Sequence, residues 1–161
     1  MQRRGILLGA ILAMTGAAAA KAANPSMLET FKYDAPDFAH PLPKALHRLV
    51  VQVSDDRPEL WTMALNNVGA TQAALGKDNV HIVVVTYGPG LKMIMTGSPV
   101  ADRVAALDAA GVEFDACWNT MQGMQKATGK LPDLLPPAVI VPSGVVRIMQ
   151  LQTHAFLYLR P

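Results

Sequence analysis

Residues 80–90 of the 161-residue chain read VHIVVVTYGPG, and this stretch decides the fold. Its first six residues are nearly all β-branched and apolar, which is typical of a strand covered on both faces of a sheet. The run then meets Gly88-Pro89-Gly90, a combination that breaks regular structure and predicts a tight turn. The stretch therefore predicts a central strand of an α/β protein, with further layers above and below it.

Further strand patterns flank this one, and helical patterns separate them. In the first helical pattern Trp61, Leu65 and Val68 recur at the spacing of one helix face, and Gly76 ends the run. Strands are expected at residues 49–53, 80–85, 112–117, 138–141 and 155–159, and helices at 58–75, 98–110, 119–126 and 143–151. This alternation predicts a three-layer α/β/α sandwich with a five-stranded, mostly parallel sheet.

The strand-to-helix turns of such a sheet all lie at its carboxyl edge, because the crossovers are right-handed. Ligands usually bind at this edge in open α/β sheets. The turns are expected at residues 54–57, 86–92, 117–120 and 142–144. The turn at 86–92 lacks the third glycine of a dinucleotide-binding loop, so its glycines predict a close approach of backbone to a pocket rather than a nucleotide site.

The helix expected after Ser143, which is its cap residue, carries the apolar residues Val145, Val146, Met149 and Leu151.

The first 22 residues have the layout of a secretory signal peptide, with Arg3 and Arg4 before an uncharged apolar run and then small residues. Cleavage is expected after Ala22, by the Sec route rather than the twin-arginine route, with an uncleaved membrane anchor as the alternative. Cleavage removes three basic residues and no acid, so the formal net charge falls from +2 to −1. The mature protein is predicted to be periplasmic, with no nucleic-acid partner and no stable membrane insertion.

The mature chain divides into two parts by composition. Residues 23–46 contain four prolines and no sustained period, which predicts an irregular arm that packs on the domain or on a neighbouring subunit. Residues 47–161 are predicted to form one domain, and the mature chain is long enough for a hydrophobic core.

Cys117 is the only cysteine, and it lies where a strand is expected to end and a helix to begin. Backbone N–H groups and the helix dipole at such a junction favour the reactive thiolate. Lys92 and Arg147 are candidate cations to assist it, although each is more typical of a solvated surface charge. Asp115 opposes activation, because it shares a strand face with Cys117 and a nearby carboxylate raises a thiol pKa.

The acids Glu113 and Asp115 point to the same face of their strand, which is costly unless they are paired. We expect this face to meet water, a cation or another subunit, with Arg103 as one candidate partner. The histidines and the single cysteine have no metal-ligand spacing, and no serine-nucleophile motif is present, so neither a metal nor a cofactor is predicted. The methionines are expected to fill the core or an interface, with copper binding as a minor alternative.

Several short motifs along residues 47–161 give a resemblance to a known family. They are WxxxLNN from Trp61, VxYGPGL from Val85, GVxFxACxNTM from Gly111, VPxGVV from Val141, and Leu151-Gln152. In this combination the chain resembles the DsrE/DsrF-like proteins of sulfur oxidation and sulfur relay. It is similar in particular to their small stand-alone members, some of which carry export signals.

The resemblance implies an α/β/α sandwich that assembles into trimers or hexamers. It also implies an exported sulfur-handling protein in which Cys117 carries sulfane sulfur as a persulfide and needs no cofactor. Cys117 would exchange this sulfur atom with a donor or acceptor protein or with a small sulfur compound. Asn119 and Thr120 follow Cys117 in the matching loop. The pocket walls are expected from Tyr87, Gly88, Pro89, Gly90, Lys92, Ser143 and Gly144. The alternative is a noncatalytic binding or assembly module with an inert Cys117.

Overall fold

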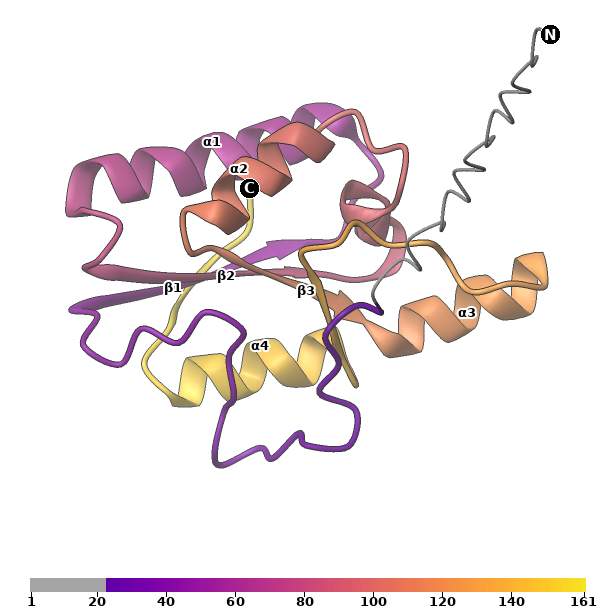
Figure 1. Cartoon of the computed structure of the whole chain (residues 1–161), viewed down its shortest axis with the longest axis horizontal. Coiled ribbons are helices and arrows are strands. Elements are labelled where there is room, and N and C mark those ends of the chain that lie inside the picture. Colours follow the sequence, from indigo (N-terminus) through magenta and orange to yellow (C-terminus); the bar gives the residue numbers. More distant parts are fainter. Residues whose placement is uncertain (1–22) are drawn as a thin grey trace, which may run out of the picture.

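The computed structural model describes residues 23–161, so the predicted signal peptide at 1–22 lies outside the described residues. A sheet with the strand order β4-β3-β2-β1-β5 forms its centre (Figure 1). All neighbouring strands in it are parallel. The strands are β1 (His47–Val53), β2 (Val80–Thr86), β3 (Glu113–Cys117), β4 (Ala138–Val141) and β5 (Leu157–Leu159). The predicted parallel sheet, with VHIVVVT as its middle strand, is confirmed.

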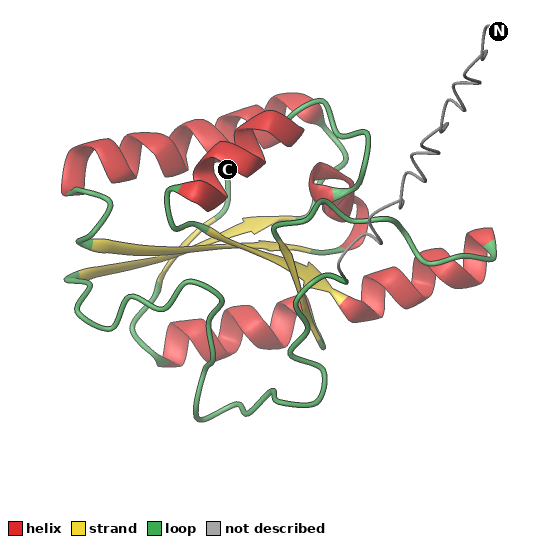
Figure 2. Ribbon diagram, viewed as in Figure 1, coloured by secondary structure: helices red, strands yellow, loops and turns green. Residues whose placement is uncertain are grey.

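Helices cover both faces of this sheet and form the predicted three-layer sandwich (Figure 2). The helices α1 (Pro58–Leu75) and α2 (Ala101–Ala109) lie on one face, and α4 (Gly144–Thr153) lies on the other. The helix α3 (Trp118–Thr128) starts at the carboxyl edge, and the 3₁₀ helix η1 (Gly88–Ile94) replaces the irregular turn that the sequence predicts after β2. Among residues 23–161, no helix is both long and apolar enough to cross a membrane.

The two faces of the sheet bury cores of different size. β2 is buried along its whole length, and its side chains alternate between the two cores. Ile82 and Val84 belong to the larger core beneath α1 and α2. Val83 and Val85 belong to a smaller core, which Ile148 of α4 helps to cover. Because α4 is a single short helix, this second face needs a further covering layer.

The arm, residues 23–46, supplies that layer. Near its start the Met27 N–H donates to the Ile140 carbonyl, and the Ile140 N–H donates to the Pro25 carbonyl, each at 2.8 Å. The arm thereby pairs with the outer edge of β4 and shields it from pairing with other chains. It then crosses the face of the sheet on which α4 lies (Figure 1), and Phe38 packs against the smaller core.

The helix α4 turns a polar face to the sheet. Val145, Val146 and Met149, which the sequence places on this helix, are 51%, 38% and 52% exposed. Arg147 and Gln150 are fully buried in their place. The reason is electrostatic, because the sheet face beneath α4 carries two buried carboxyl groups that require a buried cation.

Candidate functional site

Cys117 lies at the carboxyl edge of the sheet, as the last residue of β3 and directly before α3. It occupies the N-cap position of α3 with extended backbone angles, φ −69° and ψ 114°. Its side chain makes no capping hydrogen bond, and only 5% of its surface is exposed. The thiol is thus at the junction that the sequence predicts, but it lies beneath the surface rather than in an open loop.

Turns from three strand ends meet at this edge. The Gly88 N–H donates to Oγ1 of Thr120 at 2.8 Å, which joins the turn after β2 to the first turn of α3. The Asn119 N–H donates to a backbone carbonyl of the β4–α4 turn at 3.4 Å. Gly144 lies against the ring of Tyr87, since a Cβ added to Gly144 would be 3.0 Å from Cβ of Tyr87. These five residues of the predicted site are therefore brought together.

Gly90, Pro89 and Ser143 shape the turns. Pro89 lies in the first turn of η1. Gly90 touches the end of β1 so closely that an added Cβ would lie 2.4 Å from the Val53 carbonyl oxygen. Oγ of Ser143 caps α4 by accepting from the Val146 N–H at 3.5 Å, as its position before the helix predicts.

Lys92 has a partner of its own. It forms an ion pair with Asp56, and the two side chains are 51% and 42% exposed. Solvent screens a pair of this kind. The sequence analysis names Lys92 as a candidate cation for the thiol, but its charge is balanced by a carboxylate in the turn after β1.

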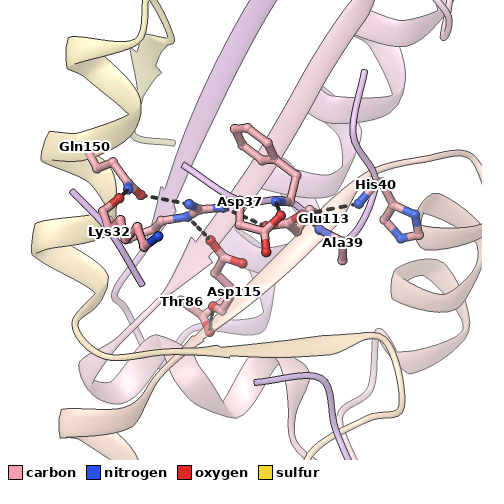
Figure 3. A network of polar contacts seen from close by, with 10 residues as sticks. Lys32, Asp37, Ala39, His40, Thr86, Glu113, Asp115 and Gln150 are labelled. Carbon is pink, nitrogen blue, oxygen red and sulfur yellow. Dashed lines mark hydrogen bonds and ion pairs between the residues drawn. The ribbon is translucent and has the colours of Figure 1, made fainter. Parts of the chain in front are cut away.

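Arg147 is the centre of a buried ion cluster beneath α4 (Figure 3). The prediction of a solvated surface charge is wrong, because its side chain is fully buried. Nε donates to Oδ2 of Asp115 at 2.9 Å, and Nη2 donates to Oε1 of Glu113 at 2.8 Å. Nη1 donates to Oε1 of Gln150 at 2.8 Å. Arg103, the partner suggested by the sequence, bonds to a side chain of α1 instead.

The same cluster fastens the arm to the domain. Nη2 of Arg147 also donates to the Asp37 carbonyl at 2.8 Å, and Oε2 of Glu113 accepts from a backbone N–H of the arm at 2.6 Å. Nε2 of Gln150 donates to the Lys32 carbonyl at 2.6 Å. Figure 3 shows these arm residues gathered around the carboxyl groups of β3. Because arm groups complete the hydrogen bonds of buried charges, we infer that arm and domain fold as one unit.

The cluster holds two carboxyl groups for one guanidinium, and this shifts the pKa of Asp115 and of Arg147. Burial raises the pKa of Asp115 well above its ordinary value, Glu113 raises it further, and Arg147 opposes both. Oδ1 of Asp115 is buried and has no hydrogen-bond partner among the described residues, and a buried carboxylate oxygen without a partner favours the protonated form. Burial acts to lower the pKa of Arg147, but the two carboxyl groups outweigh it and raise that pKa. Protonation of one carboxyl group leaves the buried cluster electrically neutral.

Both candidate cations for Cys117 are therefore engaged by carboxyl groups. Arg147 is held by Glu113 and Asp115, and Lys92 is paired at the surface. N–H groups in the first turn of α3 can also stabilise a thiolate, although that of Asn119 already donates to the Pro142 carbonyl at 3.4 Å. Within residues 23–161, no group of three His, Cys, Asp or Glu side chains could hold a metal ion.

An apolar groove of about 540 Å³ runs beside the carboxyl edge, between η1 and α3. Lys92, Met95 and Met124 are among its lining residues. Of the residues that the sequence assigns to the pocket walls, only Lys92 lines this groove. Of the other predicted wall residues, Tyr87 packs against Gly144, and Gly90 packs against the end of β1.

The fold and this edge define a small α/β/α protein whose single thiol ends a strand of a parallel sheet. The chain belongs to the same family as a structurally characterised protein of unknown function from Methanobacterium thermoautotrophicum. The two are 31% identical, the match covers 71% of this chain and 99% of that protein, and the TM-score is 0.65. No known family model matches the chain, and no curated protein matches it.

The sequence analysis missed Arg147 as the counter-ion of the two acids. A usable signal was present, because Glu113 and Asp115 share one face of a strand whose neighbours are apolar. Arg147 and Gln150 also lie three residues apart, on one face of the helix that follows the next strand. Two buried carboxyl groups opposite an Arg-x-x-Gln pair indicate a buried ion cluster.

Proposed function

We propose that the protein handles sulfur, with Cys117 accepting a sulfane sulfur atom as a persulfide and passing it to an acceptor. The observation that supports this role is the position of the thiol at the N-cap of α3 without a capping bond, where the N–H groups of the helix favour a negatively charged sulfur. The resemblance to DsrE/DsrF-like proteins supports the same role.

The transfer is an exchange between sulfur atoms that needs no oxidant. The Cys117 thiolate attacks the outer sulfur of a donor persulfide, the sulfur–sulfur bond of the donor breaks, and the donor leaves as a thiolate. The new sulfur–sulfur bond holds the transferred atom on Cys117. Attack on that outer atom by an acceptor thiolate regenerates the Cys117 thiolate. Thiosulfate serves as a donor in the same way, with sulfite as the leaving group.

Burial of the thiol sets a structural condition on this role. With 5% of Cys117 exposed, a donor reaches the sulfur only when the surrounding turns move. We place this movement at the contact between Tyr87 and Gly144, because the glycine offers no side chain to hold the ring. The proposed location is the periplasm, reached by Sec export and cleavage after Ala22.

A second candidate function is a noncatalytic binding or assembly module with an inert Cys117. Two observations favour it. The thiol is buried, and both candidate cations are engaged by carboxyl groups. A cysteine in such surroundings behaves as a small hydrophobic residue.

Sulfur uptake separates the two candidates. We expect the mature protein to gain the mass of one sulfur atom on incubation with thiosulfate or polysulfide, and to lose it again with excess thiol. The variant Cys117→Ser is expected to gain nothing, because the chain has no other cysteine. Intact-protein mass spectrometry measures both results.

Alkylation of the thiol is the control for access. The rate for the native protein near neutral pH is compared with the rate in denaturant, where Cys117 is fully open. Native labelling much faster than global unfolding supports the carrier. Labelling that proceeds only as fast as the protein unfolds, together with no sulfur uptake, contradicts the carrier and supports the inert module.

We also propose that the protein is a homo-oligomer, a trimer or hexamer, and that the outward face of α4 forms the contact. Val145, Val146 and Met149 are exposed on this helix. The neighbouring edge strand β5 exposes Leu157 and Tyr158, at 73% and 44%. Exposed apolar patches of this kind mark interaction sites.

Substitution of Met149 by glutamate is expected to shift the oligomer toward monomer, because a charge at an apolar contact must be desolvated without a partner. Sedimentation velocity measures the distribution. Gln125→Glu adds the same charge at an exposed position of another helix, α3, and serves as the control. A monomeric native protein at micromolar concentration, or an assembly that is unchanged in Met149→Glu, contradicts the proposed contact.

A further inference from the structure

A cavity of about 460 Å³ lies at the amino edge of the sheet, opposite the edge that carries Cys117. Arg48 and His81, near the starts of β1 and β2, line it from the sheet. The arm supplies another wall with Phe38, and the turn between α4 and β5 supplies a third with Phe156. The volume falls within the range of about 300–1,000 Å³ that is typical of small-molecule sites.

Aromatic rings form much of the inner surface of this cavity. The rings of Phe38 and His81 meet edge to face with centroids 4.4 Å apart, and those of Phe156 and His81 with centroids 5.3 Å apart. Prolines of the arm complete the wall. Because prolines restrict the backbone, the arm holds the cavity open at little entropic cost to binding.

His81 supplies a buried part of the cavity wall. The residue is 3% exposed, and its Nε2 atom has no hydrogen-bond partner among the described residues. Burial lowers the pKa of His81, with Glu113 acting against it, which favours the neutral imidazole. The ring therefore adds no second positive charge beside Arg48.

Arg48 brings a cation to the same cavity. It forms no ion pair with any residue in the range 23–161, and its contact is a long hydrogen bond, 3.5 Å, from Nη1 to the His154 carbonyl. No aspartate or glutamate lines the cavity. Because no carboxylate of the cavity wall pairs with the Arg48 guanidinium, a ligand that carries a carboxylate can pair with it while its apolar part contacts the apolar walls.

We propose that this cavity binds a small aromatic carboxylic acid. The carboxylate pairs with the guanidinium of Arg48, and the ring of the ligand lies against the apolar wall that contains Phe38 and Phe156, whose own rings stack with centroids 5.8 Å apart. The apolar walls exclude small inorganic anions, which prefer a fully polar site. The single positive charge of Arg48 pairs with a ligand that carries one negative charge.

This site is separate from the sulfur chemistry proposed for Cys117. Arg48 and His81 lie at the amino ends of their strands, whereas Cys117 ends β3 at the other edge. Strands of this length place the two edges about 20 Å apart. Loss of either function therefore leaves the other measurable.

Titration of the mature protein with benzoate and phenylacetate, followed by calorimetry, tests the site. We expect saturable binding of an acid and none of benzyl alcohol, which has the ring without the charge. Arg48→Met is expected to weaken binding at least about tenfold. Leu42→Trp, at another lining position, is expected to abolish binding by filling the space.

Two controls accompany these variants. Arg57→Met removes an exposed arginine elsewhere and is expected to leave binding unchanged, as is Cys117→Ser. The proposal is overturned if neither acid binds saturably at millimolar concentration. It is also overturned if an acid binds equally well to Arg48→Met and to Leu42→Trp, because binding then takes place outside the cavity.

Discussion

Replacement of Arg147 by methionine is expected to lower the free energy of unfolding by about 3–5 kcal/mol. The substitution keeps most of the buried volume but leaves Glu113 and Asp115 without their cation, at positions with no solvent exposure. It also removes the hydrogen bond to the Asp37 carbonyl, so the arm loses part of its attachment. Denaturant unfolding measures the loss, and limited proteolysis within residues 23–46 measures release of the arm.

Arg103→Met is the matched control, because the same substitution there removes an exposed hydrogen bond to a helix side chain. It is expected to change stability by no more than about 0.5 kcal/mol. Adding Glu113→Gln and Asp115→Asn to Arg147→Met is expected to recover much of the loss, since no buried charge is then unpaired. A loss below about 1 kcal/mol in Arg147→Met contradicts the cluster as described.

The pH dependence of the same cluster gives an independent check. The pKa of Asp115 is raised in the folded protein, so its contribution to stability is complete below the ordinary carboxyl pKa. That contribution is lost as pH rises through the folded pKa. Asp115→Asn has no such titration, and its stability is expected to depend less on pH from about pH 4 upward.

Gly90→Ala is expected to cost about 3 kcal/mol of stability. The added Cβ would lie 2.4 Å from the Val53 carbonyl oxygen and 2.7 Å from Cα of Ser54. Both are backbone atoms that cannot rotate away, so the cost reaches the upper part of the range of about 1–3 kcal/mol for overpacking. Because η1 must then move away from β1, the turn beside Cys117 is expected to loosen and alkylation of the thiol to become faster.

Gly123→Ala is the matched control for this glycine. Gly123 is exposed on α3, and an added Cβ meets no atom within 4 Å. Alanine there is expected to stabilise the protein by up to about 1 kcal/mol, through helix propensity alone. Equal stability of Gly90→Ala and the native protein in denaturant unfolding contradicts the close contact between η1 and β1.

The sheet could be predicted from the sequence because its strands are marked by continuous β-branched apolar runs and by breakers at their ends. A continuous β-branched run such as residues 80–85 has no polar face, so it requires cover on both sides. Breakers such as Gly88-Pro89-Gly90 then fix where the strand ends. The position of Cys117 at the carboxyl edge follows from the same alternation of strands and helices.

The orientation of α4 could not be predicted from its own pattern. The helix carries two competing faces, one with Val145 and Met149 and one with Arg147 and Gln150. The choice between them depends on carboxyl groups from another strand, which periodicity within the helix does not contain. The exposed apolar face that results is the observation behind the proposed oligomer contact.

The amino-edge cavity could not be predicted either. One of its walls is the arm, which has no periodicity to indicate where it packs. His81 is part of a nearly continuous apolar strand pattern, and its spacing from the other histidines indicates no ligand site. Only the arrangement of arm, sheet and α4–β5 turn forms a cavity beside Arg48, which makes no ion pair with any described residue.

The mass of the protein isolated from its own cell envelope tests the sulfur-carrier role most directly. Cells are supplied with thiosulfate, and thiols and persulfides are trapped at lysis. We expect a chain that begins at Ala23, with a fraction carrying one additional sulfur atom on Cys117. A protein recovered only with an unmodified Cys117, whatever sulfur compound is supplied, contradicts it.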